Sequence, residues 1–275
     1  MAYTRHKKRS TVKEHIAAKK TLGQHFLTSR PVLSRIATAI PLSDFETIVE
    51  VGPGTGHLTE LLLEHSKKLI AVEKDRDLIP LLKKRFGTSQ KFSLIEGDVL
   101  DELKKKELFK NLGSYAIIAN LPYYITGQFL RSVFALDAPP RAMVLLLQKE
   151  VAIRICAAPP SMSMLSLSCQ LYSRPKVLFP VKRGLFSPPP KVDSAVIVFH
   201  AIQNKEQSLN DAVLLLAKAG FSHKRKLLRN NISGFFDPQS RPIETAFSSC
   251  NIGASARAQE LSLDAWKCLA QHSKK

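Results

Sequence analysis

The chain has 275 residues, of which 44% are hydrophobic, so it can bury one substantial core and a small second unit. Lys and Arg number 41 against 23 Asp and Glu, and the formal net charge of +18 favours a polyanionic partner, although basic charge also serves solubility alone. No apolar run approaches the roughly twenty residues of a membrane span and no signal-peptide apolar region begins the chain, so we expect neither a membrane nor a secreted protein.

The first segment, residues 1–20, is basic and contains Glu14 as its single acid. We expect it to be a mobile arm that contacts RNA. A transit peptide is the alternative, because such peptides are also basic and poor in acids, but the segment lacks their Ser-rich amphipathic pattern. The positive residues of the arm are Arg5, Lys7, Lys8, Arg9, Lys13, Lys19 and Lys20.

A strand, a glycine turn and a helix follow one another from residue 47. The apolar stretch 47–52 predicts the strand, and the turn contains Gly52, Gly54 and Gly56. Glycines are needed where the backbone bends sharply and a ligand approaches the main chain closely. A dinucleotide site would have its third glycine at position 57, which is His57 here. The turn is instead similar to the glycine loop of S-adenosylmethionine-dependent methyltransferases; a glycine turn without a ligand is the alternative.

Acids stand at the ends of the next two predicted strands, 69–73 and 92–95. Glu73 ends the first of them, where a carboxylate can accept both hydroxyls of a ribose. Asp98 follows the second and could accept from an adenine amino group. The plain alternatives are an exposed strand-end Glu and a turn Asp after Gly97.

The predicted strand 115–120 ends in Asn120, Leu121, Pro122 and Tyr123. An exocyclic amine on a flat ring is a poor nucleophile unless acceptors hold its hydrogens, and the Asn120 side-chain oxygen and a carbonyl beside Pro122 could do so. Proline fixes the turn, and the Tyr123 ring offers a face on which a base can stack. An Asn-x-Pro turn with a packed tyrosine is the alternative.

Further strands are predicted at 142–147 and 195–200, and helical patterns lie between most strands. This alternation predicts an α/β domain, Rossmann-like, with a mainly parallel sheet and helices on both faces. Beyond residue 203 only helical segments follow, at 211–219, 224–231, 242–247 and 260–272. We therefore divide the chain into the arm at 1–20, a catalytic domain at 21–202 and a small all-helical domain at 203–275.

Two groups of basic residues could bind the phosphates of a nucleic acid. Lys224, Arg225, Lys226 and Arg229 fall on the predicted helix 224–231, and a solvated helix face is the alternative. Lys149 and Lys191 lie near the predicted pocket mouth and are weaker candidates for RNA binding.

The four cysteines, at positions 156, 169, 250 and 268, have no Cys-x-x-Cys spacing. Their separation suggests neither a zinc site nor a disulfide framework, so we expect no metal and a reducing, cytoplasmic environment.

Taken together, the motifs resemble those of the ribosomal RNA adenine N6,N6-dimethyltransferases that act on the small subunit. The resemblance covers almost the whole chain. It is carried by the stretches 22–27, 52–56, 73–76, 97–98, 120–123, 147–152, 186–194 and 224–231.

The resemblance implies S-adenosylmethionine as the cofactor, flanked by His25 and Leu27, lined by Gly52 and Gly54, and bound by Glu73 and Asp98. Asn120 would close the site near the reactive methyl group. Tyr123 and Phe186 would sandwich a flipped adenine, because a stacked and paired base cannot be methylated on its amino nitrogen. The implied substrate is two adjacent adenosines in a hairpin near the 3′ end of the small-subunit (16S) RNA, on an assembling subunit, with the protein acting as a monomer.

One departure from the family pattern and two alternatives remain. Met162 and Ser163 stand where relatives carry Tyr-Gly, and we expect this change to fall in a surface loop near the RNA. The same chemistry could serve large-subunit RNA, as in the macrolide-resistance enzymes, or DNA, although those resistance enzymes tend to have Ile at the place of Leu121. A non-catalytic assembly factor is the other alternative.

Overall fold

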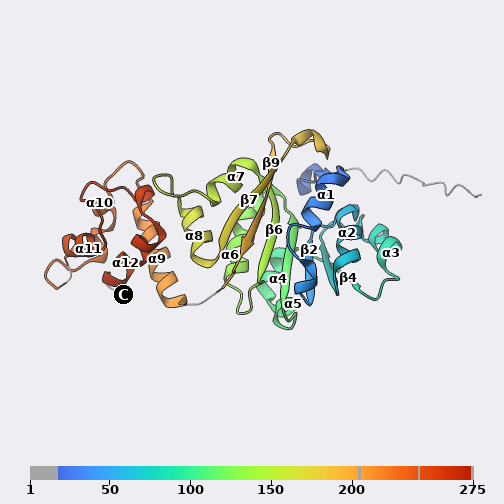
Figure 1. Ribbon diagram of the computed structural model, residues 1–275, viewed down its shortest axis with the longest axis horizontal. Helices are drawn as coiled ribbons and strands as arrows, with labels where there is room; N and C mark the ends of the chain where they lie inside the picture. The colour runs from blue at the N-terminus through green and yellow to red at the C-terminus, as the bar shows by residue number, and fades with distance from the viewer. Residues whose placement is uncertain (1–17, 204–205, 241, 274–275) are drawn as a thin grey trace, which may run out of the picture.

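Figure 1 shows the computed structural model, which describes residues 18–203, 206–240 and 242–273. A central sheet is covered by helices on both faces, and a further group of helices lies beyond one side. The strands of the sheet are β2 (Thr47–Val51), β3 (Leu69–Glu73), β4 (Phe92–Glu96), β5 (Tyr115–Asn120), β6 (Ala142–Gln148), β7 (Arg174–Val181) and β9 (Ser194–His200). The helices packed around it are α1 (Arg30–Ala37), α2 (His57–His65), α3 (Ile79–Phe86), α4 (Val99–Lys105), α5 (Glu107–Lys110), α6 (Thr126–Phe134), α7 (Lys149–Ile155) and α8 (Met164–Tyr172).

The sheet is mainly parallel, as the alternation of strands and helices predicts. Its order is β4-β3-β2-β5-β6-β9-β7, in which the first five strands are parallel and β9 is antiparallel to both of its neighbours. Every residue of β2 and β3 is buried, because helices cover both faces of the sheet at these strands. The six strands predicted from the sequence are confirmed to within one residue at each end.

Alternate residues of each strand enter two different hydrophobic cores. Ile48 and Ile118 pack with the layer of α1 and α2, whereas Val49 and Ile117 pack with α4, α6 and α8. This alternation follows from the two-residue period of a strand. Figure 1 shows the two helix layers on opposite sides of the sheet. The sheet is therefore a fixed platform for the loops at its edges.

The sequence does not predict β7. Pro175 and Pro180 lack the N–H that a central strand must donate, so the segment does not read as a strand. In the structure β7 is the last strand of the sheet and pairs only with β9, and an edge strand tolerates proline. The prolines thus mark its edge position.

A two-stranded sheet joins the N-terminal segment to the chain before β9. Its strands are β1 (Phe26–Leu27) and β8 (Phe186–Ser187), in which Leu27 pairs with Phe186. The Thr28 N–H also donates to the Leu185 carbonyl oxygen at 2.9 Å. This pairing holds residues 22–27 over the carboxyl edge of the main sheet.

Beyond β9 the described chain is helical, as expected. The helices are α9 (Gln207–Gly220), α10 (Leu228–Ile232), α11 (Ile243–Ser249) and α12 (Leu263–His272). The predicted helix 224–231 is wrong in its first half, because Leu227 is extended (φ −61°, ψ 142°) and the helix begins after it. Lys224, Arg225 and Lys226 therefore lie in the turn between α9 and α10, and only Arg229 is helical.

These helices share a core with the sheet. Trp266 of α12 is fully buried and belongs to the same hydrophobic cluster as Ile117 of β5 and Leu167 of α8. Packing between α8 and both α9 and α12 joins the two parts. The division between residues 202 and 203 as two separate domains stays a prediction.

The expectation of no disulfide was wrong. A disulfide bond joins Cys250, at the end of α11, to Cys268 of α12. The residues are 18 positions apart, so no short spacing reveals them, and the packing of α11 on α12 brings their Cα atoms to 5.7 Å. His272 lies beside them, with Nδ1 4.0 Å from the Cys250 sulfur. Cys156 and Cys169 are free thiols.

The last residue of α9 is a glycine that the packing of Trp266 requires. A Cβ at Gly220 would lie 2.6 Å from the Trp266 ring and 3.0 Å from Leu228 Cδ1. We expect Gly220→Ala to lower the free energy of unfolding by about 1–3 kcal/mol, because overpacking forces a buried ring to shift. Thermal or urea denaturation measures this, with Gly234→Ala as the control, since a Cβ there meets nothing within 4 Å. Equal stability of the two variants would contradict the packing argument.

Candidate active site

A cavity opens at the carboxyl ends of β2 to β5, where open α/β sheets bind ligands. Its walls come from the loops after these strands and from the N-terminal residues 22–27. The structure therefore brings together residues that the sequence spreads over a hundred positions. The predicted site residues that line the cavity are His25, Leu27, Gly52, Gly54, Glu73, Asp98, Asn120, Leu121, Pro122 and Tyr123.

The glycine loop has a backbone that other residues rarely adopt. Gly52 and Gly54 have φ angles of +69° and +59°, and a Cβ on Gly54 would lie 3.0 Å from the Phe26 ring. Glycine is needed for both reasons, the left-handed backbone and the close approach of the N-terminal segment. At Gly52 and Gly54 the loop thus presents main chain to the cavity, without a side chain.

Glu73 is held by backbone amides at the end of β3. Its Oε2 accepts a hydrogen bond from the Gly54 N–H at 3.0 Å, and its Oε1 accepts one from the Asp75 N–H at 2.8 Å. Burial raises the pKa of the Glu73 carboxyl, and these backbone hydrogen bonds oppose the rise. The carboxylate is therefore fixed in position, with lone pairs left on both oxygens for a ligand.

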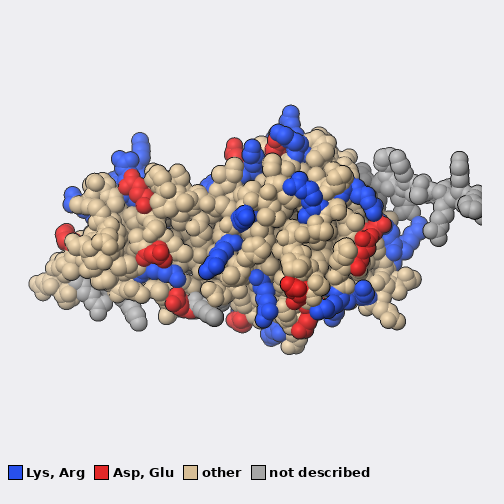
Figure 2. All heavy atoms as spheres, viewed as in Figure 1, with Lys and Arg blue, Asp and Glu red and all other residues tan. Residues whose placement is uncertain are grey.

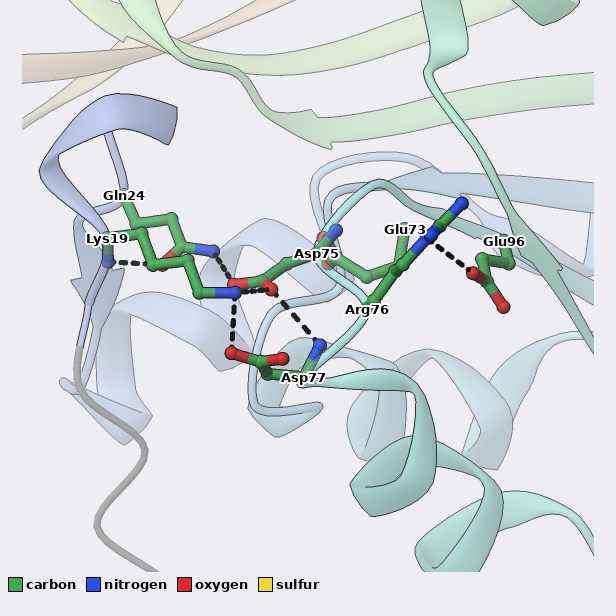
Figure 3. Close-up of polar contacts among 7 residues, drawn as sticks. All are labelled: Lys19, Gln24, Glu73, Asp75, Arg76, Asp77 and Glu96. Atoms are coloured by element: carbon green, nitrogen blue, oxygen red, sulfur yellow. Dashed lines mark hydrogen bonds and ion pairs between the residues drawn. The ribbon is translucent and has the colours of Figure 1, made fainter.

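The N-terminal segment is fastened to the loop after β3 by a polar network (Figure 3). Asp75 accepts from Lys19 Nζ at 2.5 Å and from Gln24 Nε2 at 2.6 Å, and Lys19 also pairs with Asp77 at 2.6 Å. Hydrogen bonds to Asp75 and Asp77 raise the pKa of Lys19. Lys19, expected in the RNA-contacting arm, is instead paired with the two acids of the loop after β3. Residues 1–17 of that arm lie outside the described chain.

Asp98 has two structural partners besides any ligand. Its Oδ1 accepts from the Leu100 N–H at 2.9 Å, which caps α4, and its Oδ2 accepts from Lys74 Nζ at 2.8 Å. Although burial opposes it, the hydrogen bonds from Lys74 and Leu100 lower the pKa of Asp98. Asp98 is therefore an ionised acceptor on the cavity wall.

Sequence reasoning missed Glu50, which lies in the middle of β2 beside the cavity. Its side chain is only 1% exposed, and Oε2 accepts no hydrogen bond from any residue that the structure describes. Burial raises the pKa of Glu50 to about 8; the Thr59 hydroxyl nearby opposes the rise, and the Glu73 carboxylate adds to it. The sequence offered one signal that could have identified Glu50, namely an acid within a mainly apolar strand. Such a buried, unpaired oxygen suits a cationic or N–H ligand group.

The turn after β5 places Asn120 between the N-terminal segment and Tyr123. Asn120 Nδ2 donates to the His25 carbonyl oxygen at 3.2 Å, which leaves Oδ1 as an acceptor that no described residue uses. The Tyr123 and His25 rings are stacked, with centroids 6.3 Å apart and planes inclined by 23°. The Tyr123 hydroxyl shares a hydrogen bond with Ser194 Oγ at 2.8 Å, so the ring is held from both sides.

Phe186 is not part of the cavity wall formed by the described residues. Its side chain is 5% exposed and packs in the core with Leu27 and Phe179. A role in sandwiching a base requires its ring to be exposed by a movement of the chain before β9, and the role stays a prediction. The aromatic ring facing Tyr123 in this structure is His25.

The predicted RNA-binding residues lie at two separate places. Lys149 and Lys191 line a groove at the start of α7, beside the main cavity. The side chains of the other group, Lys224, Arg225, Lys226 and Arg229, are all exposed near the start of α10.

The departure at Met162 does not fall on the surface. Met162 is buried, and its N–H donates to the Gln259 carbonyl oxygen at 3.0 Å, which ties the segment before α8 to the C-terminal helices. Ser163 caps α8 through the Ser166 N–H at 3.2 Å. The expectation of a surface loop was therefore wrong, because the C-terminal helices cover this segment.

Comparison with known proteins identifies the family. The sequence model of the family described as ribosomal RNA adenine dimethylase matches residues 16–274. The chain belongs to this family. A curated protein of Dehalococcoides mccartyi, named ribosomal RNA small subunit methyltransferase A, is 38% identical over 256 residues, which cover 92% of this chain and 88% of that protein.

Solved structures share the fold of this family member. A dimethyladenosine transferase from Plasmodium falciparum matches with a TM-score of 0.75 and 24% identity, over 89% of this chain and 96% of that one. The 23S rRNA methyltransferase ErmE matches with a TM-score of 0.74 and 21% identity, over 90% of this chain and 99% of that one. The Rossmann-like methyltransferase fold predicted from the sequence is thus confirmed.

The raised pKa of Glu50 leads to a prediction about stability. The folded protein holds a proton on Glu50 up to about pH 8, whereas the unfolded chain loses it near 4.5, so this group lowers stability as pH rises through that interval. We expect Glu50→Gln to raise the free energy of unfolding at pH 9 by roughly 2–4 kcal/mol and to have little effect at pH 4.5. Denaturation at both pH values, with Glu64→Gln on the exposed part of α2 as control, measures this. An unchanged stability at pH 9 would contradict it.

Proposed function

We propose that this protein transfers methyl groups from S-adenosylmethionine to the N6 amines of two adjacent adenosines, in a hairpin near the 3′ end of small-subunit (16S) ribosomal RNA. The product would be N6,N6-dimethyladenosine. The observation that carries the proposal is the single cavity that joins a glycine loop and two acids to the Asn120 turn. Membership of the dimethylase family supports the reaction type.

The residues of the cavity fit S-adenosylmethionine. Gly52 and Gly54 leave room that a Cβ would fill, and the unpaired Glu50 oxygen and the fixed Glu73 carboxylate suit the ammonium and the ribose hydroxyls. Asp98 would accept from the adenine amino group, and His25 and Leu27 would cover the ligand from the N-terminal segment. The bound cofactor supplies a methyl group activated by its sulfonium charge.

Asn120 would make the target amine nucleophilic. Its unused Oδ1 can accept one amine hydrogen, and the Leu121 carbonyl oxygen, which receives no hydrogen bond within the described chain, can accept the other. The Pro122 carbonyl is already taken by the Ile125 N–H at 3.2 Å. Two acceptors draw the nitrogen lone pair out of the ring, and the proton lost after attack can leave to solvent or to a carbonyl. Catalysis then consists mainly of alignment and amine polarisation.

Tyr123 would stack on the extruded adenine, because a base must leave its helix before its amino group can be reached. The ring is already held by His25 on one side and by Ser194 at its hydroxyl. Phe186 would close on the other face of the base once its ring leaves the core. The base then lies in a fixed plane with its amine at Asn120.

The basic residues would bind the RNA on an assembling small subunit. Figure 2 shows Lys and Arg side chains along the upper edge of the sheet and over the C-terminal helices. We infer that Lys224, Arg225, Lys226 and Arg229 contact phosphates, together with Lys149 and Lys191. The positive charge of these residues would contribute binding affinity for RNA, while stacking and the shape of the cavity would determine which base is bound.

We propose that the enzyme acts as a monomer. None of the helices within the described residues is long and apolar enough to cross a bilayer. We propose that the protein acts in the cytoplasm, where small subunits are assembled.

Substitution of Asn120 distinguishes a catalytic role of the protein from a role in subunit assembly alone. We expect Asn120→Ala to lower methyl transfer at least about a hundredfold, because a positioned polar group at the reacting centre is lost, while binding of small subunits is retained. Transfer of label from S-adenosylmethionine to unmethylated small subunits measures this, and Asn111→Ala on the surface is the control. Full activity of Asn120→Ala would rule out the proposed amine activation.

The position of the label tests the target. The chain is 38% identical, over 92% of its length, to a relative named as a small-subunit methyltransferase, which favours small-subunit RNA. We expect label in two neighbouring adenosines of 16S RNA. Label only in large-subunit RNA or DNA would make the target assignment wrong.

A further inference from the structure

A second, basic groove lies beside the candidate active site. Lys149, at the start of α7, and Arg183, Lys191 and Asp193, from the segment between β7 and β9, line it together with Glu150. Figure 1 shows α7 and this segment at the same end of the sheet. Lys149 and Lys191 were expected near RNA, but Arg183 was not recognised from the sequence.

The groove is held in shape by its own hydrogen bonds. Asp193 Oδ1 accepts from the Arg183 N–H at 2.9 Å, and the Asp193 carbonyl oxygen accepts from the Lys149 N–H at 3.0 Å. Arg183 Nη1 reaches the Lys191 carbonyl oxygen at 3.4 Å. One acid thus fixes the backbone of two of the basic residues.

Three basic residues, Lys149, Arg183 and Lys191, and two acids, Glu150 and Asp193, line the groove, so that the basic residues are in excess. One of the two acids, Asp193, is already paired with Lys182 at 3.2 Å. Within the described chain, neither Lys149 nor Lys191 forms an ion pair, and the Arg183 guanidinium donates to a carbonyl oxygen and not to an acid. Such a set of cations favours an anion with several acceptor oxygens.

Ser194 connects the groove to the predicted base site. Asp193 is followed directly by Ser194, which is fully buried and shares its hydrogen bond with the Tyr123 hydroxyl at 2.8 Å. Ser194 also pairs with Gln148, the residue before Lys149. The groove and the Tyr123 wall of the cavity are therefore two sides of one structural element.

We propose that this groove binds a backbone phosphate of the RNA strand next to the adenosine that enters the cavity, with Arg183 as its main contact. The inference rests on the proposed function, because a nucleic-acid substrate whose base stacks on Tyr123 places a backbone phosphate next to that base. Phosphate contacts of this kind set the register of a strand, while the base itself is chosen in the cavity. The groove therefore selects which nucleotide of the hairpin can reach Asn120.

Charge-removing variants test the groove. We expect Arg183→Gln and Lys191→Gln each to raise the KM for unmethylated small subunits about three- to tenfold with kcat near that of the wild type, because only phosphate binding is weakened. Each should also reduce the slope of log affinity against log salt by about 0.7–0.9, the contribution of one phosphate contact. A merely structural role would not change that slope.

Lys176→Gln is the matched control. Lys176 is exposed on β7 and pairs with Val198, far along the strand from Ser194, so it carries the same charge change away from the groove. Its KM and salt slope should equal those of the wild type, and all three variants should bind S-adenosylmethionine equally well. If Arg183→Gln behaves like Lys176→Gln while the wild type methylates small subunits, the groove assignment is overturned. If the wild type itself does not methylate them, the proposed function fails, and the groove proposal fails with it.

Discussion

The parallel register of β2, β3, β4 and β5 is the constraint on which the site depends. Because these strands run in one direction, their carboxyl ends meet at one edge, and the residues that follow them converge there. Both faces of the sheet are packed with helices, so the strand ends cannot shift independently. Gly52, Glu73, Asp98 and Asn120 are therefore held at fixed separations around one cavity.

Buried acids give this edge its chemical character. Glu73 is fixed by the Gly54 and Asp75 amides, Asp75 fastens Lys19 and Gln24, and Glu50 remains buried with an unpaired oxygen. Burial without full pairing lowers stability, as the raised pKa of Glu50 indicates. Local instability of this kind is typical of binding sites, because the ligand supplies the missing partner.

The basic surface and the cavity are parts of one arrangement. Ser194 links the Tyr123 ring to Asp193, and Asp193 organises the groove of Lys149, Arg183 and Lys191. The C-terminal helices carry a second basic group and share their core with the sheet through α8. An RNA contacted at both places would be oriented by a rigid body, and a rigid body can present one nucleotide to one pocket.

The sequence by itself determined the six main strands, the glycine loop and the residues that follow each strand, because apolar periodicity and turn residues are local signals. It did not determine β7, whose prolines are tolerated only at an edge, nor the start of α10, the burial of Met162 or the Cys250–Cys268 bond. The hydrogen bond of Lys19 to Asp75 joins residues 56 positions apart, and that of Tyr123 with Ser194 joins residues 71 positions apart. Only the tertiary structure decided these contacts, since nothing local in the chain encodes which distant side chain will lie opposite.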